Sequence, residues 1–137
     1  MTAEKTTKII AQKAIIRNPE GKWLILLRAA NETAYPDLWD LPGGKLESGE
    51  EQLKNVQREV KEETGLQIKP EKIIGIYRDT LRNTPVEFVV YAVQAVTDQV
   101  TIGQEHSAYR WATITEISEL PAMPYMRQLM VDFEIKN

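Results

Sequence analysis

The sequence predicts an α/β protein, an α/β/α sandwich built around a mixed β-sheet. The segments 22–28 and 86–96, KWLILLR and VEFVVYAVQAV, are rich in β-branched and apolar residues. A helical period covers 49–64, and a second helical pattern runs near the C-terminus. Strands that surround one central helix, with another helix at the end, indicate a sheet covered by helices on both faces.

The composition limits the class of protein. The 137 residues suit one core, so we expect a single domain over 1–137. The net charge of −3 argues against a partner held by a broad basic surface, such as a nucleic acid polymer. The absence of cysteine excludes thiol catalysis and cysteine-ligated zinc. The chain has no signal-like start and no apolar run of about 18 residues, so we expect a cytoplasmic protein without a membrane partner.

The N-terminal part predicts a β-hairpin. KIIAQKAIIR at 8–17 has strand character, NPEG is a strong turn signal, and 22–28 follows it. WLILL is apolar on both faces, so we expect this strand to be buried in the middle of the sheet. Residues 29–49 carry several Pro and Gly residues and predict a loop.

The central helix is expected at about 49–64. Ser48 followed by Glu51 has the spacing of a capping box, and Gly65 stands where the residue after a helix belongs. An apolar stripe at helical spacing (Leu53, Val56 and Val60) predicts the buried face. The later elements are expected as strands near 66–69, 72–80, 86–96 and 109–112, then helices near 115–119 and 124–134.

Three glutamates crowd this helix within REVKEETG at 58–65. Each residue advances about 100° around the axis, so with Glu59 at zero, Glu62 falls near 300° and Glu63 near 40°. The acidic strip therefore borders the apolar stripe. A Glu-rich helix is ordinarily a solvated surface, but carboxylates at the edge of a core need a partner or must take up a proton. A divalent cation such as Mg²⁺ is a suitable partner.

A longer pattern decides between these interpretations. In chain order it is Gly44, five residues, Glu50, seven residues, Arg58-Glu59-Val60, one residue, Glu62-Glu63, one residue, Gly65-Leu66. It matches the Nudix box at every specified position, and a chance match is on the order of one in 10⁸. The chain therefore resembles a Nudix hydrolase, and the order of the flanking elements resembles the Nudix fold over nearly the whole length.

The resemblance implies an activity and a set of residue roles. Family members cut a phosphoanhydride bond in a nucleoside diphosphate linked to a group X, with Mg²⁺ or Mn²⁺. The positions of Glu59, Glu62 and Glu63 match those that hold the metal, and the carbonyl of Gly43 often adds a ligand. Arg58 matches a residue that pairs with the early glutamate of the box, here Glu50, and braces the loop; an ordinary surface ion pair is the alternative.

Other residues are implicated by their position around the box. Glu105 precedes Trp111 by six residues, a spacing at which nucleoside-triphosphate members carry a metal-binding or base glutamate. Arg28, at the end of the second strand, matches an arginine that faces the substrate, and we expect Gly44 and Lys45 beside it. The resemblance implies that a carboxylate takes the proton of the attacking water, with Glu59, Glu62 and Glu105 as candidates. His106 is expected to be a loop or packing residue.

Features outside the box favour one substrate class. The ADP-ribose type carries a proline where this chain has Leu81, and the dinucleoside polyphosphate type a tyrosine where it has Arg82, Asn83 and Thr84. We therefore expect a MutT-like (d)NTP pyrophosphohydrolase that releases pyrophosphate. Met123 stands where MutT carries a base-reading asparagine, and it lacks the amide's donor and acceptor, so an 8-oxoguanine preference is not expected.

Alternatives remain at this stage. They are a nucleotide-sugar or ADP-ribose pyrophosphatase, a non-catalytic nucleotide sensor, and an acidic interaction module without a ligand. Nothing in the sequence decides the oligomeric state, although family members are often homodimers. The expected partner is a small-molecule nucleotide.

Overall fold

The computed structural model describes residues 8–81 and 83–136. The elements follow in the order β1 (Ile9–Ile15), β2 (Trp23–Arg28), β3 (Trp39–Asp40), β4 (Gly43–Lys45), α1 (Gln52–Thr64), β5 (Ile68–Leu81), β6 (Thr84–Ala95), β7 (His106–Ala112), α2 (Ile114–Ser118) and α3 (Pro124–Lys136). This is the predicted α/β order. Arg82, which entered the substrate comparison above, lies outside the described residues.

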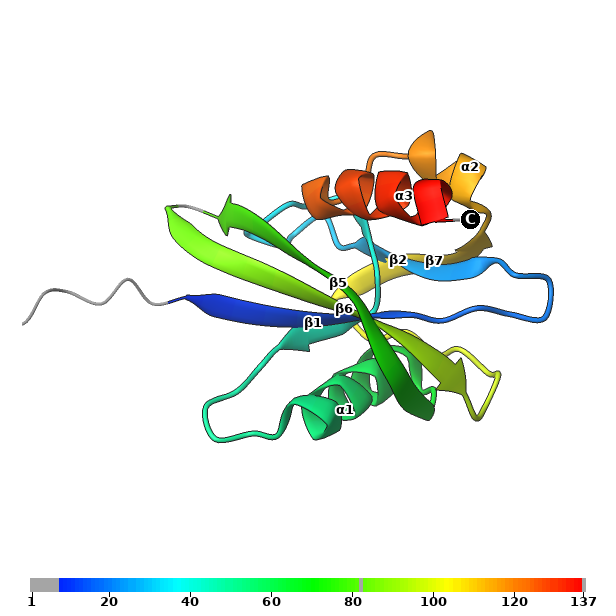
Figure 1. Ribbon diagram of the computed structural model, residues 1–137, viewed down its shortest axis with the longest axis horizontal. Coiled ribbons are helices and arrows are strands. Elements are labelled where there is room, and N and C mark those ends of the chain that lie inside the picture. Colours follow the sequence, from blue (N-terminus) through cyan, green and yellow to red (C-terminus); the bar gives the residue numbers. More distant parts are fainter. Residues whose placement is uncertain (1–7, 82, 137) are drawn as a thin grey trace, which may run out of the picture.

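The strands form two sheets, enclosed by helices on opposite sides. One sheet has the order β4-β1-β6-β5 and the other the order β3-β2-β7. β1 and β6 are parallel and the other pairs are antiparallel, so the larger sheet is mixed. Figure 1 shows α1 on one side of the strands and α2 with α3 on the other. The predicted α/β/α sandwich is confirmed.

The predicted N-terminal hairpin is only partly present. The turn forms, with Asn18 N donating to Lys22 O at 2.9 Å and an antiparallel bridge between Arg17 and Trp23. Beyond this bridge the strands separate, because β1 takes β4 and β6 as partners and β2 takes β3 and β7. Both strands carry apolar residues on both faces, so the local pattern does not reveal which long-range partners each strand selects. The expectation that β2 is central holds within its own sheet.

Alternation along the strands divides the core into two layers. Ala11 and Ile15 of β1 face α3, whereas Ala14 and Ile16 face α1. β2 alternates in the same way, with Trp23 and Ile25 on the α3 side. Consequently, the side chains of Gln12 and Lys13 lie on opposite faces of β1, with Gln12 on the α1 side and Lys13 on the α3 side.

Helix α1 begins later than predicted and without the predicted cap. Its N-cap is Glu51, in an extended conformation, and no side chain caps the helix. Ser48 lies outside the helix, in a turn in which Glu50 N donates to Glu47 O at 3.1 Å. The capping box prediction was therefore wrong. The C-terminal prediction was right, because Gly65 has φ 75° and its N–H donates to Lys61 O.

The buried face of α1 also differs from the predicted stripe. Val56 and Val60 are fully buried as expected, but Leu53 is 47% exposed. Leu53 lies in the first turn, whereas burial begins at Asn55 and continues to Thr64. A polar side chain, Asn55, thus occupies a place in the buried face that an apolar pattern does not identify.

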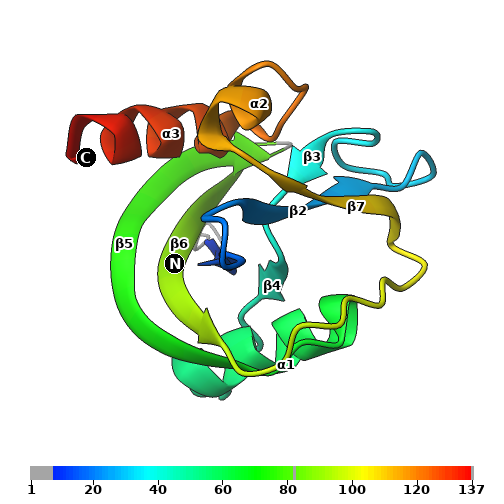
Figure 2. The ribbon, with the colours of Figure 1, turned by 90° about the vertical axis from the view of Figure 1, so that its right-hand side faces the viewer.

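The segments predicted at 66–69 and 72–80 form one strand, β5, with irregular registers after Pro70 and Ile73. β5 and β6 make a long curved hairpin that extends from α1 to the C-terminal helices (Figure 2). β7 and both C-terminal helices lie close to their predicted ranges. Within the described residues no helix is long and apolar enough to span a membrane.

Candidate active site

A cleft of about 720 Å³ runs across one end of the molecule. Polar side chains and glycines line part of it: Lys13, Arg28, Glu32, Asp40, Gly43, Gly44, Lys45, Glu47, Glu59, Glu63 and Glu105. Apolar and hydroxyl-bearing side chains line the rest: Ile9, Ala11, Thr33, Ala34, Tyr35, Leu81, Thr84, Val86, Phe88 and Met123. The cleft therefore combines a charged part with an apolar part, as sites for amphipathic ligands do.

Strand registers place these two parts in order along β1. Ile9 pairs with Val86 and Ala11 with Phe88, which brings four cleft residues together as an apolar slot. Further along, Lys13 pairs with Gly43, at the glycine strand. We use "apolar slot" for Ile9, Ala11, Val86, Phe88, Leu81 and Met123 together.

Neighbouring atoms lie so close to the two glycines of β4 that neither position has room for a Cβ atom. Gly43 has φ 144°, and a Cβ there would lie 1.8 Å from the Gln12 carbonyl oxygen. At Gly44 a Cβ would lie 2.4 Å from Glu59 Oε2. Gly43 thus lets β4 pack on β1, and Gly44 leaves room for a carboxylate of α1.

Two carboxylates of α1 meet this glycine strand. Gly43 N donates to Glu63 Oε1 at 2.8 Å. Burial raises the pKa of Glu63 to about 8, although Lys13 and the Gly43 N–H lower it. Burial also raises the pKa of Glu59, against the effect of Arg58, with a smaller contribution from Glu62. Glu59 and Glu63 border the core, as the helical geometry predicted, but the prediction was wrong for Glu62, whose side chain is 58% exposed.

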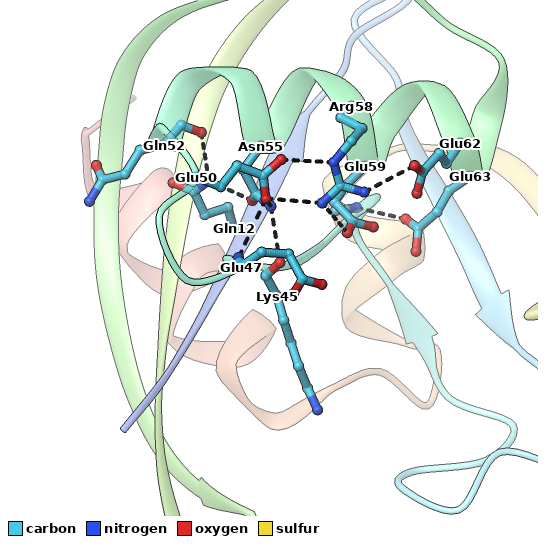
Figure 3. A network of polar contacts seen from close by, with 11 residues as sticks. Gln12, Lys45, Glu47, Glu50, Gln52, Asn55, Arg58, Glu59, Glu62 and Glu63 are labelled. Carbon is cyan, nitrogen blue, oxygen red and sulfur yellow. Dashed lines mark hydrogen bonds and ion pairs between the residues drawn. The ribbon is translucent and has the colours of Figure 1, made fainter. Parts of the chain in front are cut away.

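Arg58 forms the predicted brace (Figure 3). Its Nε and Nη2 donate to the two carboxylate oxygens of Glu50 at 2.8 and 3.0 Å. Nη1 donates to Glu62 Oε1 at 3.0 Å, and Nη2 lies 3.1 Å from Glu59 Oε1. Hydrogen bonds from Arg58 and Asn55 lower the pKa of Glu50 to about 2. A bidentate pair inside such a network fixes geometry better than an isolated surface pair.

A buried amide network, which the sequence did not reveal, supports the brace. Asn55 Nδ2 donates to Glu50 Oε1 at 2.8 Å and to Lys45 O at 3.0 Å. Gln12 Nε2 donates to Asn55 Oδ1 at 2.7 Å, and Tyr91 Oη donates to Gln12 Oε1 at 2.6 Å. Gln12 and Asn55 are fully buried. Figure 3 shows how this network ties β1, the segment after β4, and α1 together.

The remaining predicted residues divide between the rim and the loop. Arg28 and Lys45 line the cleft, as expected. Arg28 also holds the following loop, with Nη2 donating to Ala34 O at 2.8 Å and Nε to Tyr35 O at 3.1 Å. Glu105 lines the cleft just before β7. His106 is buried, its Nδ1 has no hydrogen-bond partner in the described part of the chain, and burial lowers its pKa.

A second buried cluster was missed by sequence reasoning. Asp40 is 1% exposed and accepts from Lys13 Nζ at 2.9 Å, Tyr125 Oη at 2.5 Å and Leu41 N at 2.8 Å. Arg28 Nη1 lies 3.6 Å from Asp40 Oδ2. A signal existed in the sequence, because Gln12 and Lys13 are polar residues inside an apolar strand, which indicates buried partners.

The donor chemistry of the acidic part suits a hard divalent cation. Glu59 and Glu63 present carboxylates beside the glycine strand, and burial without full countercharge disfavours their ionised forms. Over residues 8–81 and 83–136, however, no three Asp, Glu or His side chains are gathered in a metal-binding arrangement. Glu62, the third glutamate of the predicted metal set, contacts Arg58 instead and is 58% exposed at the side chain.

A cleft that joins buried carboxylates beside a glycine strand to an apolar slot has the chemistry of a site for an amphipathic, polar-ended ligand. The chain belongs to the Nudix family, because the NUDIX domain model matches residues 7–133. Members of this family hydrolyse phosphoanhydride bonds in nucleoside diphosphate derivatives, generally with a divalent metal. This chain is accordingly a phosphoanhydride hydrolase that acts on small-molecule nucleotides.

Individual relatives share much of its length. A MutT-like protein of Streptomyces ambofaciens is 31% identical over 121 residues, covering 88% of this chain and 74% of the relative. The asymmetrical bis(5'-nucleosyl)-tetraphosphatase of Mus musculus is 33% identical over 110 residues, covering 75% and 72%. The solved MutT protein structure from Methanosarcina mazei Go1 superposes with a TM-score of 0.89, 33% identity and 99% coverage of both chains.

Proposed function

We propose that the protein is a MutT-like pyrophosphohydrolase, which converts a nucleoside triphosphate and water into a nucleoside monophosphate and pyrophosphate. The observation that carries this proposal is the cleft itself. It joins an apolar slot, which suits a nucleobase, to an acidic part built on Glu59 and Glu63. Similarity to a MutT-like protein and to a MutT structure favours the same substrate class.

We assign the cation to the acidic part. Glu59, Glu63 and the Gly43 carbonyl would hold it, and Glu62 would join them by turning its exposed carboxylate away from Arg58. A bound Mg²⁺ neutralises phosphate charge and lowers the pKa of a coordinated water. Arg58 keeps α1 fixed to the preceding loop through Glu50, so that the glutamates keep their positions relative to the glycine strand.

The proton of the attacking water goes to a carboxylate of the cleft. Glu59 and Glu105 both line the cleft, whereas Glu62 does not. The carboxylate of Glu59 lies close to Gly44, in the acidic part of the cleft. Glu59 and Glu105 are therefore the two candidate bases that the cleft itself offers.

The apolar slot indicates how the base is held. Met123, at the position where an asparagine would read a base, is buried and lines the cleft. A thioether offers no paired donor and acceptor. We propose that the base is held mainly by apolar contact, so that several bases are accepted.

A second candidate is hydrolysis of a dinucleoside tetraphosphate. Identity of 33% to the murine asymmetrical tetraphosphatase favours it. Both candidates cut the same kind of bond, and they differ in whether a second nucleoside is required. Nucleotide-sugar and ADP-ribose hydrolysis are distinguished from both candidates by the same assay.

The test is a release assay for phosphate and pyrophosphate with millimolar Mg²⁺ at mildly alkaline pH. The panel covers common and oxidised (d)NTPs, nucleotide sugars, ADP-ribose and dinucleoside polyphosphates. We expect the fastest turnover with triphosphates, release of pyrophosphate, and loss of turnover in Glu62→Gln. Faster turnover of a dinucleoside tetraphosphate would select the second candidate. No release of phosphate or pyrophosphate from any compound of the panel would contradict the proposal.

A further inference from the structure

Lys13 is the one residue of β1 on the cleft side that carries a charge. Residues 9, 11 and 13 share one face of the strand, and all three line the cleft. The first two belong to the apolar slot, and Lys13 lies opposite Gly43. Successive residues on one face are about 7 Å apart. Lys13 therefore stands at the boundary between the slot and the acidic part.

The ammonium of Lys13 has donor capacity beyond its contacts. A lysine carries three N–H donors. In the described residues, one goes to Asp40 Oδ2 at 2.9 Å and a second to Leu41 O at 3.4 Å, a long contact. Lys13 is only 6% exposed, and the cleft is the surface that it lines. A ligand in the cleft can accept the remaining hydrogen bond.

Two cations share the buried carboxylate of Asp40. Lys13 Nζ and Arg28 Nη1 both approach its Oδ2 atom, at 2.9 and 3.6 Å. Arg28 has Glu32 as its other acidic neighbour, at 4.0 Å and partly exposed, which is a weak pair. Lys13 also acts electrostatically on Glu63, whose pKa it lowers against the effect of burial. The ammonium therefore lies between Asp40 and the acidic part, where an anionic ligand would gain both a donor and a countercharge.

We infer that Lys13 is a substrate-binding residue, whose ammonium donates to an oxygen of the phosphoryl group next to the ribose. The inference rests on the proposed function. A nucleotide with its base in the slot and its outer phosphates at Glu59 and Glu63 must carry its first phosphoryl group across the boundary. Asp40, held by Tyr125 and Leu41, is then the positioning residue that keeps the ammonium directed along this path.

The test compares a nucleoside with its own monophosphate, so that the contribution of the phosphoryl group is measured alone. Guanosine, adenosine, GMP and AMP are titrated by calorimetry with and without Mg²⁺, using wild type, Lys13→Met, Asp40→Asn and the double variant. In Lys13→Met we expect the monophosphate dissociation constant to rise roughly 10- to 100-fold and that of the nucleoside to stay the same. Lys54→Met, on the exposed surface of α1, is the matched control.

The other variants separate binding from folding. Lys13→Met leaves Asp40 buried with a weaker partner, so its melting temperature should fall. The double variant removes both charges and should recover that stability, yet still bind the monophosphate weakly. Asp40→Asn keeps the Lys13 ammonium but weakens the acceptor that positions it. Its monophosphate affinity should therefore fall less than that of Lys13→Met.

Two results would overturn the inference. One is recovery of wild-type monophosphate affinity in the double variant, which would make the pair purely structural. The other is equal weakening of nucleoside and monophosphate in Lys13→Met. If wild type neither binds nor hydrolyses any nucleotide, the proposed function fails first. If the wild type hydrolyses triphosphates and the KM of Lys13→Met for them equals that of the wild type, only the inference fails.

Discussion

Glu50 and Glu63 stand at opposite ends of the segment that contains α1, and their environments are opposite. Glu50 accepts two hydrogen bonds from Arg58 and one from Asn55, which together lower its pKa to about 2. Glu63 accepts one hydrogen bond from the Gly43 N–H, and burial raises its pKa to about 8. At one end of the segment, hydrogen bonds stabilise the charged form of Glu50. At the other end, burial disfavours the charged form of Glu63.

This difference shows how the chain divides stability from function. The paired end, with Glu50, Arg58 and Asn55, fixes the loop to the helix. The cleft end, with Glu59 and Glu63, keeps carboxylates in positions that disfavour their charge. Sites that hold such groups generally cost stability and are retained for function. The predictions below test this division.

The largest expected effect is at Glu59. Glu59→Gln should lower turnover roughly 10²- to 10⁴-fold, the range for loss of a general base. The same change removes a half-buried charge, so the melting temperature in EDTA should rise. Glu50→Gln should lower the melting temperature, because it weakens the bidentate pair between Arg58 and Glu50. Steady-state kinetics and thermal unfolding of both variants check this, and a loss of stability in Glu59→Gln would contradict the division.

The two glycines provide the next contrast. In Gly43→Ala the new Cβ would collide with backbone at Gln12, so we expect a loss above about 4 kcal/mol or failure to fold. In Gly44→Ala it meets the end of the Glu59 side chain, which can move. That variant should fold, with turnover reduced roughly 10- to 100-fold. Denaturant unfolding and kinetics distinguish the two, and full activity in Gly44→Ala would argue against a fixed Glu59.

Asn55 tests the paired end. Asn55→Ala removes one of the two acceptors of the buried Gln12 amide, the other being Gln52 O, and it removes a donor to the Lys45 carbonyl. We therefore expect about 1–3 kcal/mol of destabilisation. The substrate KM should change little, since Asn55 does not line the cleft. Urea unfolding measures the first effect and initial rates the second. An unchanged free energy of unfolding would show that the network is dispensable.

The stability of the folded state should fall at both ends of the pH range, at high pH because of Glu63 and at low pH because of Glu50. The pKa of Glu63 is raised from its ordinary 4.5 to about 8. The folded state then holds the proton more tightly, and stability falls as pH rises through this interval. The pKa of Glu50 is lowered to about 2, so its contribution is present above pH 4.5 and is lost as pH falls. We expect melting temperatures measured in EDTA across about pH 3 to 9 to lose the fall at high pH in Glu63→Gln and the fall at low pH in Glu50→Gln.

Much of this arrangement was predictable from local pattern. Helical spacing correctly predicted that Glu59 and Glu63 lie beside the core. The Nudix box correctly predicted that Arg58 pairs with Glu50. What failed depended on distant partners. Leu53 fits an apolar stripe by spacing, but its turn precedes the buried part of α1. Ser48 has capping chemistry, but the loop is fixed by Glu50 instead.

The missed residues have the same origin. Lys13 stands out as a polar residue inside an apolar strand, but nothing near it in the sequence identifies Asp40 as its partner. Tyr125 reaches Asp40 because the segment just before α3 pairs with β3 through the bridge between Trp39 and Ala122. Buried polar pairs of this kind depend on which segments the fold brings together, and that information lies outside any one segment.

The most direct measurement is the change in melting temperature on adding Mg²⁺ near pH 8, with wild type and Glu63→Gln compared side by side. A ligand that binds only the folded state must stabilise it. We expect wild type to gain several degrees at millimolar Mg²⁺ and Glu63→Gln to gain much less. No gain in wild type, or an equal gain in Glu63→Gln, would contradict the assignment of the cation to the cleft end of α1.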